Sequence, residues 1–287
     1  MNTLPRCSVL VIIAGLALMG AAAPEAASPA PAPAAAPANS KNTYVIVHGA
    51  WGGGFAFKAV DDLLTADGNK VYRPTLTGQG EKIHLATPDT DLNTHIQDIV
   101  NVILWENLHD VVLVGHSYGG MVITGVADRI PDRIKCIIYL DAFLPENGES
   151  LNTAGSTGAP GSGARLNLST DAGGFILYSG FNVNNQAIPR DVPMPPKTLS
   201  QPIALMNQDA VKKIPTSYAA FHSAAQSLEQ AQFYRFYQRA QARGWNMLTL
   251  VSDHNAHRSH PQDEVNLLEK AVATMAAATA TPSAPKN

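Results

Sequence analysis

Residues 111–120 read Val-Val-Leu-Val-Gly-His-Ser-Tyr-Gly-Gly. The apolar run Val111 to Val114 favours a β-strand, and an apolar pattern at helical spacing follows from Met121 to Val126. Ser117 stands at the turn between them, with a glycine two residues away on either side. Glycine has no Cβ, so it fits a turn where a side chain would collide with neighbouring elements. The stretch therefore predicts a nucleophile elbow, with the serine hydroxyl above the carboxyl edge of a sheet.

Apolar strand-like runs alternate with helical patterns on both sides of this elbow. Strands are expected at 43–47, 70–72, 111–114, 135–140, 216–220 and 246–251. Helices are expected at 57–66, after a cap at Asp91 or Thr94, from the elbow to about Pro131, and at 228–243 and 263–273. Repeated strand–helix units predict an α/β fold, with a mostly parallel sheet of about six strands covered by helices on both faces. Residues of about 145–215, rich in Gly, Ser, Asn and Pro, are expected to form a small cap inserted after the strand that follows the elbow helix.

The two ends of the chain have a different composition from the middle. Arg6, an apolar run over 9–19 and small residues up to Ala23 predict a signal peptide over 1–23, although a signal anchor stays possible. An Ala/Pro-rich linker is expected at 24–40, the folded domain at 41–275 and a flexible tail at 276–287. The sequence therefore predicts a secreted or periplasmic protein, with no stable membrane insertion once the signal peptide is removed.

Charge and cysteine content narrow the class further. The formal net charge is −3 and the basic residues are not clustered, which argues against a nucleic-acid partner. Cys136 is the one cysteine left after cleavage, so the mature monomer is expected to have no internal disulfide and to bury this thiol in a strand. A homodimer is possible.

A serine hydroxyl needs a base to take its proton, and the base needs a partner to hold its tautomer. His254 follows the last predicted strand, where an elbow fold places its base, and His257 is the reserve candidate. The spacing of His254, His257 and His260 is also compatible with a metal site, but no carboxylate or cysteine cluster completes one. We therefore expect neither a metal nor an organic cofactor.

A second glycine-rich turn follows the first predicted strand, where residues 48–54 read His-Gly-Ala-Trp-Gly-Gly-Gly. Such a turn can direct a backbone N–H at an oxyanion, and we assign this role to the amide of Ala50 together with the amide of Tyr118. The simpler alternative is that these glycines only permit a tight turn. The stretch lacks the G-x-G-x-x-G pattern and the Gly-Lys-Ser/Thr ending of phosphate-binding loops.

Four stretches together resemble a known family: His48–Trp51, Gly115–Met121, Leu140–Pro145, and His254 ahead of Pro261. They resemble the α/β-hydrolase superfamily, and in particular its small esterases related to plant methyl esterases and hydroxynitrile lyases, which include bacterial pyrethroid hydrolases. The resemblance covers about residues 43–273. It implies the α/β-hydrolase fold and a serine hydrolase that acts on carboxylic esters beneath a small cap.

The position of the triad acid departs from the usual pattern of that family. Its members usually carry the acid just after the penultimate strand, but residues 218–226 contain no carboxylate. Some members of the superfamily place the acid after the strand that follows the elbow, which here is Asp141. Glu229 is the alternative, although the first turn of a helix favours a glutamate in any case.

Aromatic residues close to the motifs suggest the substrate class. Trp51, Phe55 and Phe143 are expected to line an apolar or aromatic pocket. The sequence thus predicts a serine carboxylesterase for small or medium apolar or aromatic esters, with catalytic Ser117, His254 and Asp141. The alternatives are a hydroxynitrile lyase-type or other reaction on the same triad, and a non-catalytic ligand-binding member of the fold.

Overall fold

The computed structural model describes residues 41–154 and 167–280. The predicted signal peptide and linker, part of the cap and the last residues of the tail lie outside the described residues. In the described part, no helix combines the length and the apolar character needed to cross a membrane.

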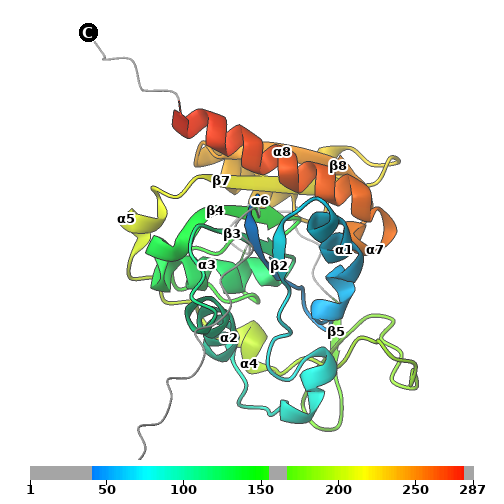
Figure 1. Cartoon of the computed structure of the whole chain (residues 1–287). Coiled ribbons are helices and arrows are strands. Elements are labelled where there is room, and N and C mark those ends of the chain that lie inside the picture. The colour runs from blue at the N-terminus through cyan, green and yellow to red at the C-terminus, as the bar shows by residue number, and fades with distance from the viewer. Residues whose placement is uncertain (1–40, 155–166, 281–287) are drawn as a thin grey trace, which may run out of the picture. The chain divides into compact units, whose positions relative to one another are not determined.

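A six-stranded parallel sheet forms the centre of the domain, in the order β2-β1-β3-β4-β7-β8 (Figure 1). The strands are β1 Thr43–Val47, β2 Lys70–Tyr72, β3 Val111–His116, β4 Ile134–Leu140, β7 Thr216–His222 and β8 Asn246–Val251. The prediction of a parallel sheet of about six strands is confirmed. Because all strands run the same way, the segments after β1, β3, β4 and β8 emerge at one edge of the sheet.

Helices cover both faces of this sheet, as the alternation of buried side chains along β1 requires. Val45 and Val47 belong to an apolar cluster shared with α2 (Leu92–Trp105), α3 (Gly119–Arg129) and α6 (Tyr234–Ala242). Tyr44 and Ile46 belong to a second cluster, shared with α1 (Lys58–Ala66) and α8 (Pro261–Ala280). Short helical turns join these elements: η1 Gly54–Phe57, η2 Gly80–Leu85, η3 Pro131–Arg133, η4 Leu228–Gln230 and α7 Ala256–Ser259.

Two helices differ from their predicted extents. The helix predicted at 228–243 is broken, because the chain extends at Ala231 between η4 and α6 and Phe233 turns inward to a buried position. The predicted flexible tail is helical up to Ala280, well beyond the predicted end at 273. Met275 still packs into the core at 4% exposed, and the exposed alanine-rich residues after it continue α8 through their high intrinsic helix propensity.

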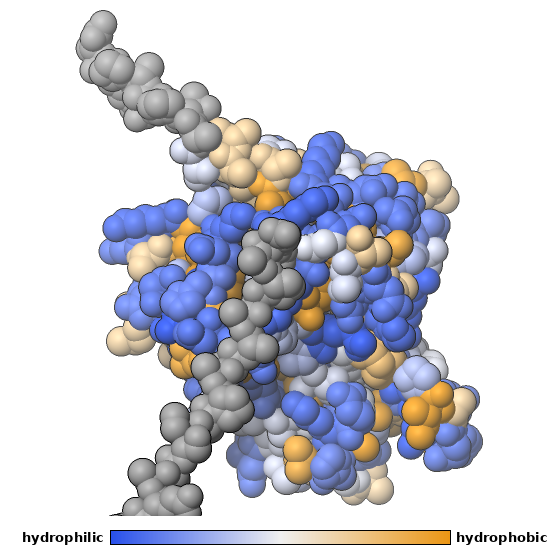
Figure 2. Space-filling model, in the orientation of Figure 1, coloured by the Kyte–Doolittle hydropathy of each residue, from blue (hydrophilic) through white to orange (hydrophobic). Residues whose placement is uncertain are grey.

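The described part of the cap contains a small antiparallel hairpin, β5 (Leu168–Thr170) with β6 (Ile176–Tyr178), and two short helices, α4 (Lys197–Ser200) and α5 (Gln208–Val211). Trp51, in the turn after β1, holds this hairpin in place. Its indole Nε1 donates to the carbonyl of Ile176 at 2.8 Å, and its own carbonyl accepts from the amide of Val192 at 2.8 Å. On the face of the molecule shown in Figure 2, hydrophilic residues predominate and the hydrophobic ones form small groups.

Candidate active site

Ser117 occupies a sharp turn between β3 and α3, with φ of 53° in the left-handed region. The flanking glycines make this turn possible. A Cβ on Gly115 would lie 2.8 Å from the carbonyl oxygen of Gly119, and a Cβ on Gly119 would lie 2.4 Å from that of Val47. Both separations are far below van der Waals contact, so the predicted steric need for glycine at these positions is confirmed.

Asp141 follows β4 and makes a short contact with His254, which follows β8. The distance from Asp141 Oδ2 to His254 Nδ1 is 2.6 Å, and Asp141 is only 2% exposed. Its other oxygen accepts from the amide of Phe221 at 3.1 Å, which fixes the carboxylate. Glu229, the alternative acid, is exposed in η4, where a hydrogen bond with Ser227 lowers its pKa. The structure thus brings Asp141, and not Glu229, to the predicted base.

Two neighbours hold His254 in place. The ring of Phe233 stacks on the imidazole, with centroids 5.0 Å apart and planes 7° apart. Nε2 of His116, the elbow residue before Ser117, donates to the carbonyl oxygen of His254 at 2.7 Å. Burial keeps the pKa of His116 well below its ordinary value, so this imidazole is neutral. Nothing in the sequence pattern pointed to Phe233, because the predicted helix ran through it.

His257, the reserve candidate for the base, is buried behind the site. Its ring stacks on Phe57 with centroids 4.2 Å apart, and burial lowers its pKa to about 3. Among the residues that the structure describes, no carboxylate is hydrogen-bonded to Nδ1 of His257 in the way that Asp141 contacts His254. Over the same residues, no group of three or more His, Cys, Asp or Glu side chains is arranged to hold a metal ion.

The two amides assigned to an oxyanion hole lie close to Ser117. Neither the Ala50 nor the Tyr118 N–H donates to another group within residues 41–154 and 167–280. The turn that carries Ala50 packs directly on the elbow, since a Cβ on Gly49 would lie 3.0 Å from Cβ of Ser117. The Tyr118 side chain points away from the pocket, and its hydroxyl lies 2.9 Å from Nδ1 of the buried His95.

Ser117 and His254 line one cavity of about 280 Å³. Aromatic side chains form much of its wall: Trp51, Phe57, Phe143, Tyr178 and Phe233. Trp51 and Phe143 thus lie where the sequence predicted. Phe55 does not line this cavity, because η1 turns Phe57 inward and leaves Phe55 under the guanidinium of Arg258, 5.8 Å from its ring centroid.

Sequence reasoning missed a polar clasp of three residues that line this cavity, Tyr178, Asp191 and Arg258. The Tyr178 hydroxyl donates to Asp191 Oδ2 at 3.0 Å, and Arg258 contacts Asp191 Oδ1 at 3.3 Å. Tyr178 and Asp191 belong to the cap, whereas Arg258 lies in α7, just after the base. The clasp therefore links the cap to the segment that carries His254.

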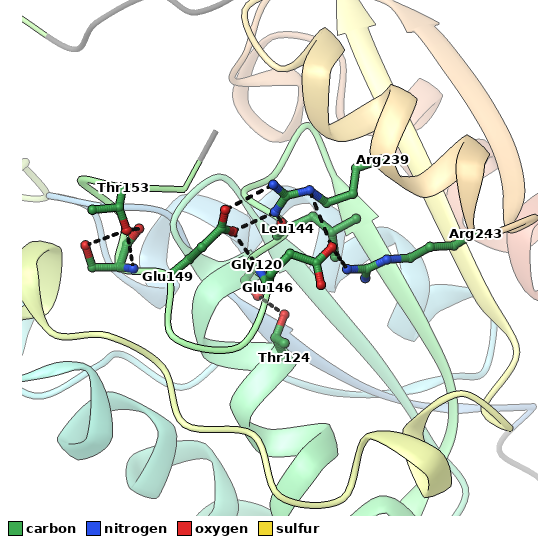
Figure 3. A network of polar contacts seen from close by, with 9 residues as sticks. Gly120, Thr124, Leu144, Glu146, Glu149, Thr153, Arg239 and Arg243 are labelled. Carbon is green, nitrogen blue, oxygen red and sulfur yellow. Dashed lines mark hydrogen bonds and ion pairs between the residues drawn. The ribbon is translucent and has the colours of Figure 1, made fainter. Parts of the chain in front are cut away.

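A second polar network holds the segment that follows Asp141 (Figure 3). Arg239 of α6 donates to the carbonyl of Leu144 at 2.6 Å and to Glu149 at 2.6 Å. Arg243, one helical turn later, pairs with Glu146 at 2.6 Å. These contacts tie residues 144–149 to the end of α6, so the segment that follows Asp141 in the chain is held in place.

The model of the alpha/beta hydrolase family matches residues 44–266. The carbendazim hydrolyzing esterase of Nocardioides sp. is 53% identical over 108 residues, which is 38% of this chain and 45% of that protein. The pyrethroid hydrolase of Sphingobium wenxiniae is 36% identical over 121 residues, 42% of each chain. The matched stretch thus covers less than half the length of these curated relatives.

Solved structures resemble the chain over a larger part of its length. An extracellular alpha/beta-hydrolase from a Paenibacillus species superimposes with a TM-score of 0.62 at 24% identity, over 80% of this chain and 98% of that one. At this identity the likeness supports the fold alone. The family match runs over most of the chain and includes the serine turn and the segment of His254, so this protein belongs to the alpha/beta hydrolase family.

Proposed function

We propose that this protein is a serine carboxylesterase that hydrolyses small or medium apolar or aromatic esters through an acyl-enzyme. The observation that carries the proposal is the 2.6 Å contact between Asp141 and His254 at a cavity that Ser117 also lines. A buried carboxylate on Nδ1 fixes the tautomer in which Nε2 is free to accept a proton.

The proposed reaction uses each group in turn. Ser117 Oγ attacks the ester carbonyl while His254 Nε2 takes its proton, and Asp141 stabilises the imidazolium that forms. The amides of Ala50 and Tyr118 stabilise the oxyanion of the tetrahedral intermediate. His254 then gives its proton to the leaving alcohol. Water next attacks the acyl-enzyme while His254 takes its proton, and His254 returns that proton to Ser117 Oγ as the acid is released.

The cavity supports the substrate class. Its volume of about 280 Å³ is at the small end for ligand pockets. Its aromatic wall fits an apolar or aromatic group rather than a charged one, and its charged members Asp191 and Arg258 are paired with each other. Two relatives are named as a carbendazim hydrolyzing esterase and a pyrethroid hydrolase, which supports an esterase reaction.

Hydrolysis of a series of p-nitrophenyl esters, from acetate to dodecanoate, tests the proposal. We expect turnover of the short esters and a steep fall for the long ones. Asp141→Asn should lower kcat by about 10⁴-fold, the loss typical of a triad base left in the wrong tautomer. Glu229→Gln is the matched control and should stay within about twofold of the parent, because its carboxylate does not reach the base.

Ser117→Ala completes the test. It should abolish turnover while the protein keeps its far-UV circular dichroism spectrum. Equal turnover by this variant would overturn the mechanism, and no turnover of any ester by the parent would favour the lyase or the ligand-binding alternative.

We also propose that the mature protein is secreted or periplasmic, on the basis of the signal-peptide pattern over residues 1–23. Fractionation of producing cells followed by N-terminal sequencing tests this. An intact N-terminus in the cytoplasmic fraction would contradict it.

A further inference from the structure

A second cavity, of about 660 Å³, lies away from Ser117. It begins where β7 and β8 start, at Thr216 and Asn246, and extends over β4 to Thr124 of α3. The candidate active site is at the opposite ends of these strands, and no described residue lines both cavities. A volume of this size falls in the usual range for small-molecule sites.

Apolar and aromatic side chains that are only half-buried form its walls. Leu205, Val211, Ile214 and Trp245 all line the cavity and pack against the core from its rim. Trp245 is stacked on the buried Tyr139, with ring centroids 5.5 Å apart and planes 20° apart. The guanidinium of Arg243 also lies over the Trp245 ring, 5.1 Å from its centroid, so the indole is held rigidly and offers an apolar aromatic edge to the cavity.

The polar groups at the inner end are hydroxyls. Thr124 Oγ1 donates to the carbonyl of Gly120 at 2.7 Å and lies 2.8 Å from the Tyr139 hydroxyl. The buried carboxylate of Asp128 also lines the cavity, but it accepts from the amides of Met206 at 2.8 Å and Asn207 at 2.7 Å. These neutral main-chain donors hold the carboxylate in place at the inner end of the cavity, where it counts among the acidic groups of the lining.

The charged groups of the lining are three cations, Lys212, Lys213 and Arg243, and two carboxylates, Glu146 and Asp128. Arg243 is paired with Glu146 at 2.6 Å, and Lys212 with the exposed Asp209 at 2.9 Å. Lys213 has no ion-pair partner among the residues that the structure describes. In the described part of the chain, Lys213 is thus the lining cation left without an ion pair next to an apolar interior, and the lining holds one more cation than carboxylate.

We propose that this cavity is a second binding site, and that its ligand is a small amphiphilic anion, with an aromatic or alkyl body on Trp245 and an acidic head at Lys212 and Lys213. The apolar part of the ligand is removed from water when it packs on the half-buried side chains, and its acidic group lies beside the cations of the rim. The site does not depend on the proposed esterase activity.

A pair of fluorescent probes tests this site. 1-Anilinonaphthalene-8-sulfonate is an aromatic amphiphilic anion, and N-phenyl-1-naphthylamine has the same rings without the sulfonate. Titrated into the full chain, the anionic probe should bind at one site, and added salt should weaken it but not the neutral probe. Lys212→Gln/Lys213→Gln should weaken the anionic probe by about three- to tenfold and change the neutral probe by less than about twofold.

Two further variants locate the site. Ala278→Trp places an indole in the cavity from the exposed face of α8 and should abolish binding of both probes. Lys58→Gln/Lys70→Gln removes two positive charges elsewhere and should change neither. Unchanged affinity in both Ala278→Trp and the Lys212/Lys213 variant would overturn the proposal. Loss of binding in Trp51→Ala, with Ala278→Trp unaffected, would overturn it as well, because the probe would then occupy the Ser117 cavity.

Discussion

Replacing Glu264 with glutamine should stabilise this protein at high pH and have little effect at low pH. Glu264 lies in α8 and is fully buried, and neither of its carboxylate oxygens has a hydrogen-bond partner in the described part of the chain. Burial raises the pKa of this carboxyl from 4.5 to about 8, because the charged form would be left without water or a partner.

The magnitude follows from this pKa. The unfolded chain releases the proton near pH 4.5, whereas the folded protein retains it up to about pH 8. Stability is therefore fully present below the unfolded pKa and is lost as the pH rises through the folded one. At about 1.36 kcal/mol per pKa unit, the free energy of unfolding falls by about 4–5 kcal/mol across this window. Glutamine does not titrate, so this contribution to the pH slope should disappear.

Urea unfolding followed by circular dichroism, repeated from about pH 5 to about pH 8, measures the effect. The parent and Glu264→Gln should differ most at the upper end and converge at the lower end. Asp263→Asn is the matched control, since Asp263 is the exposed neighbour in the same turn, and its curve should follow the parent. A Glu264→Gln curve parallel to the parent over the whole range would refute the reasoning.

Contacts of the elbow and of the buried core give three further expected outcomes. Gly120→Ala should destabilise the fold by at least about 3 kcal/mol in urea unfolding, because its Cβ would lie 2.0 Å from the carbonyl oxygen of Phe143. His116→Phe should lower kcat about tenfold with little change in KM, because the carbonyl of His254 loses its buried donor. Cys136 should react with Ellman's reagent only after unfolding, since it is buried and burial raises its pKa to about 11.

Each of these has its own check. Gly52→Ala should be nearly neutral, because a Cβ there meets nothing closer than 3.9 Å. A kcat for His116→Phe within about twofold of the parent would mean that its hydrogen bond does not position the base. The thiol assay uses a Cys7→Ser background, so that the signal reports Cys136 alone, and fast labelling of the folded protein would contradict its burial.

The features predictable from the sequence are those that depend on neighbours along the chain. The elbow is set by the steric demands on Gly115 and Gly119, and the order of strands by alternating apolar runs. The choice of Asp141 needed one further rule, that the ends of parallel strands meet at one edge. The structure brings it to His254 at 2.6 Å.

The features that escaped prediction depend on contacts between distant segments. Phe233 leaves its predicted helix because it packs against His254, more than twenty residues away. The pairing of Asp191 with Arg258 and the cavity beside Trp245 likewise arise only once the cap and α6 are in place. The prediction that Phe55 lines the pocket was wrong because of local geometry. The 3₁₀ turn η1 points the ring of Phe57, and not that of Phe55, into the cavity.

The left-handed backbone of the site has a consequence for directed evolution. Five described non-glycine residues have positive φ, and three of them, Trp51, Ser117 and Asp141, lie at the site. Each costs roughly 1–3 kcal/mol of backbone strain, which glycine would relieve. A library selected for thermostability alone is therefore expected to accumulate glycine at these positions and to lose turnover as it gains heat resistance. Selection for this protein's activity must be applied in every round.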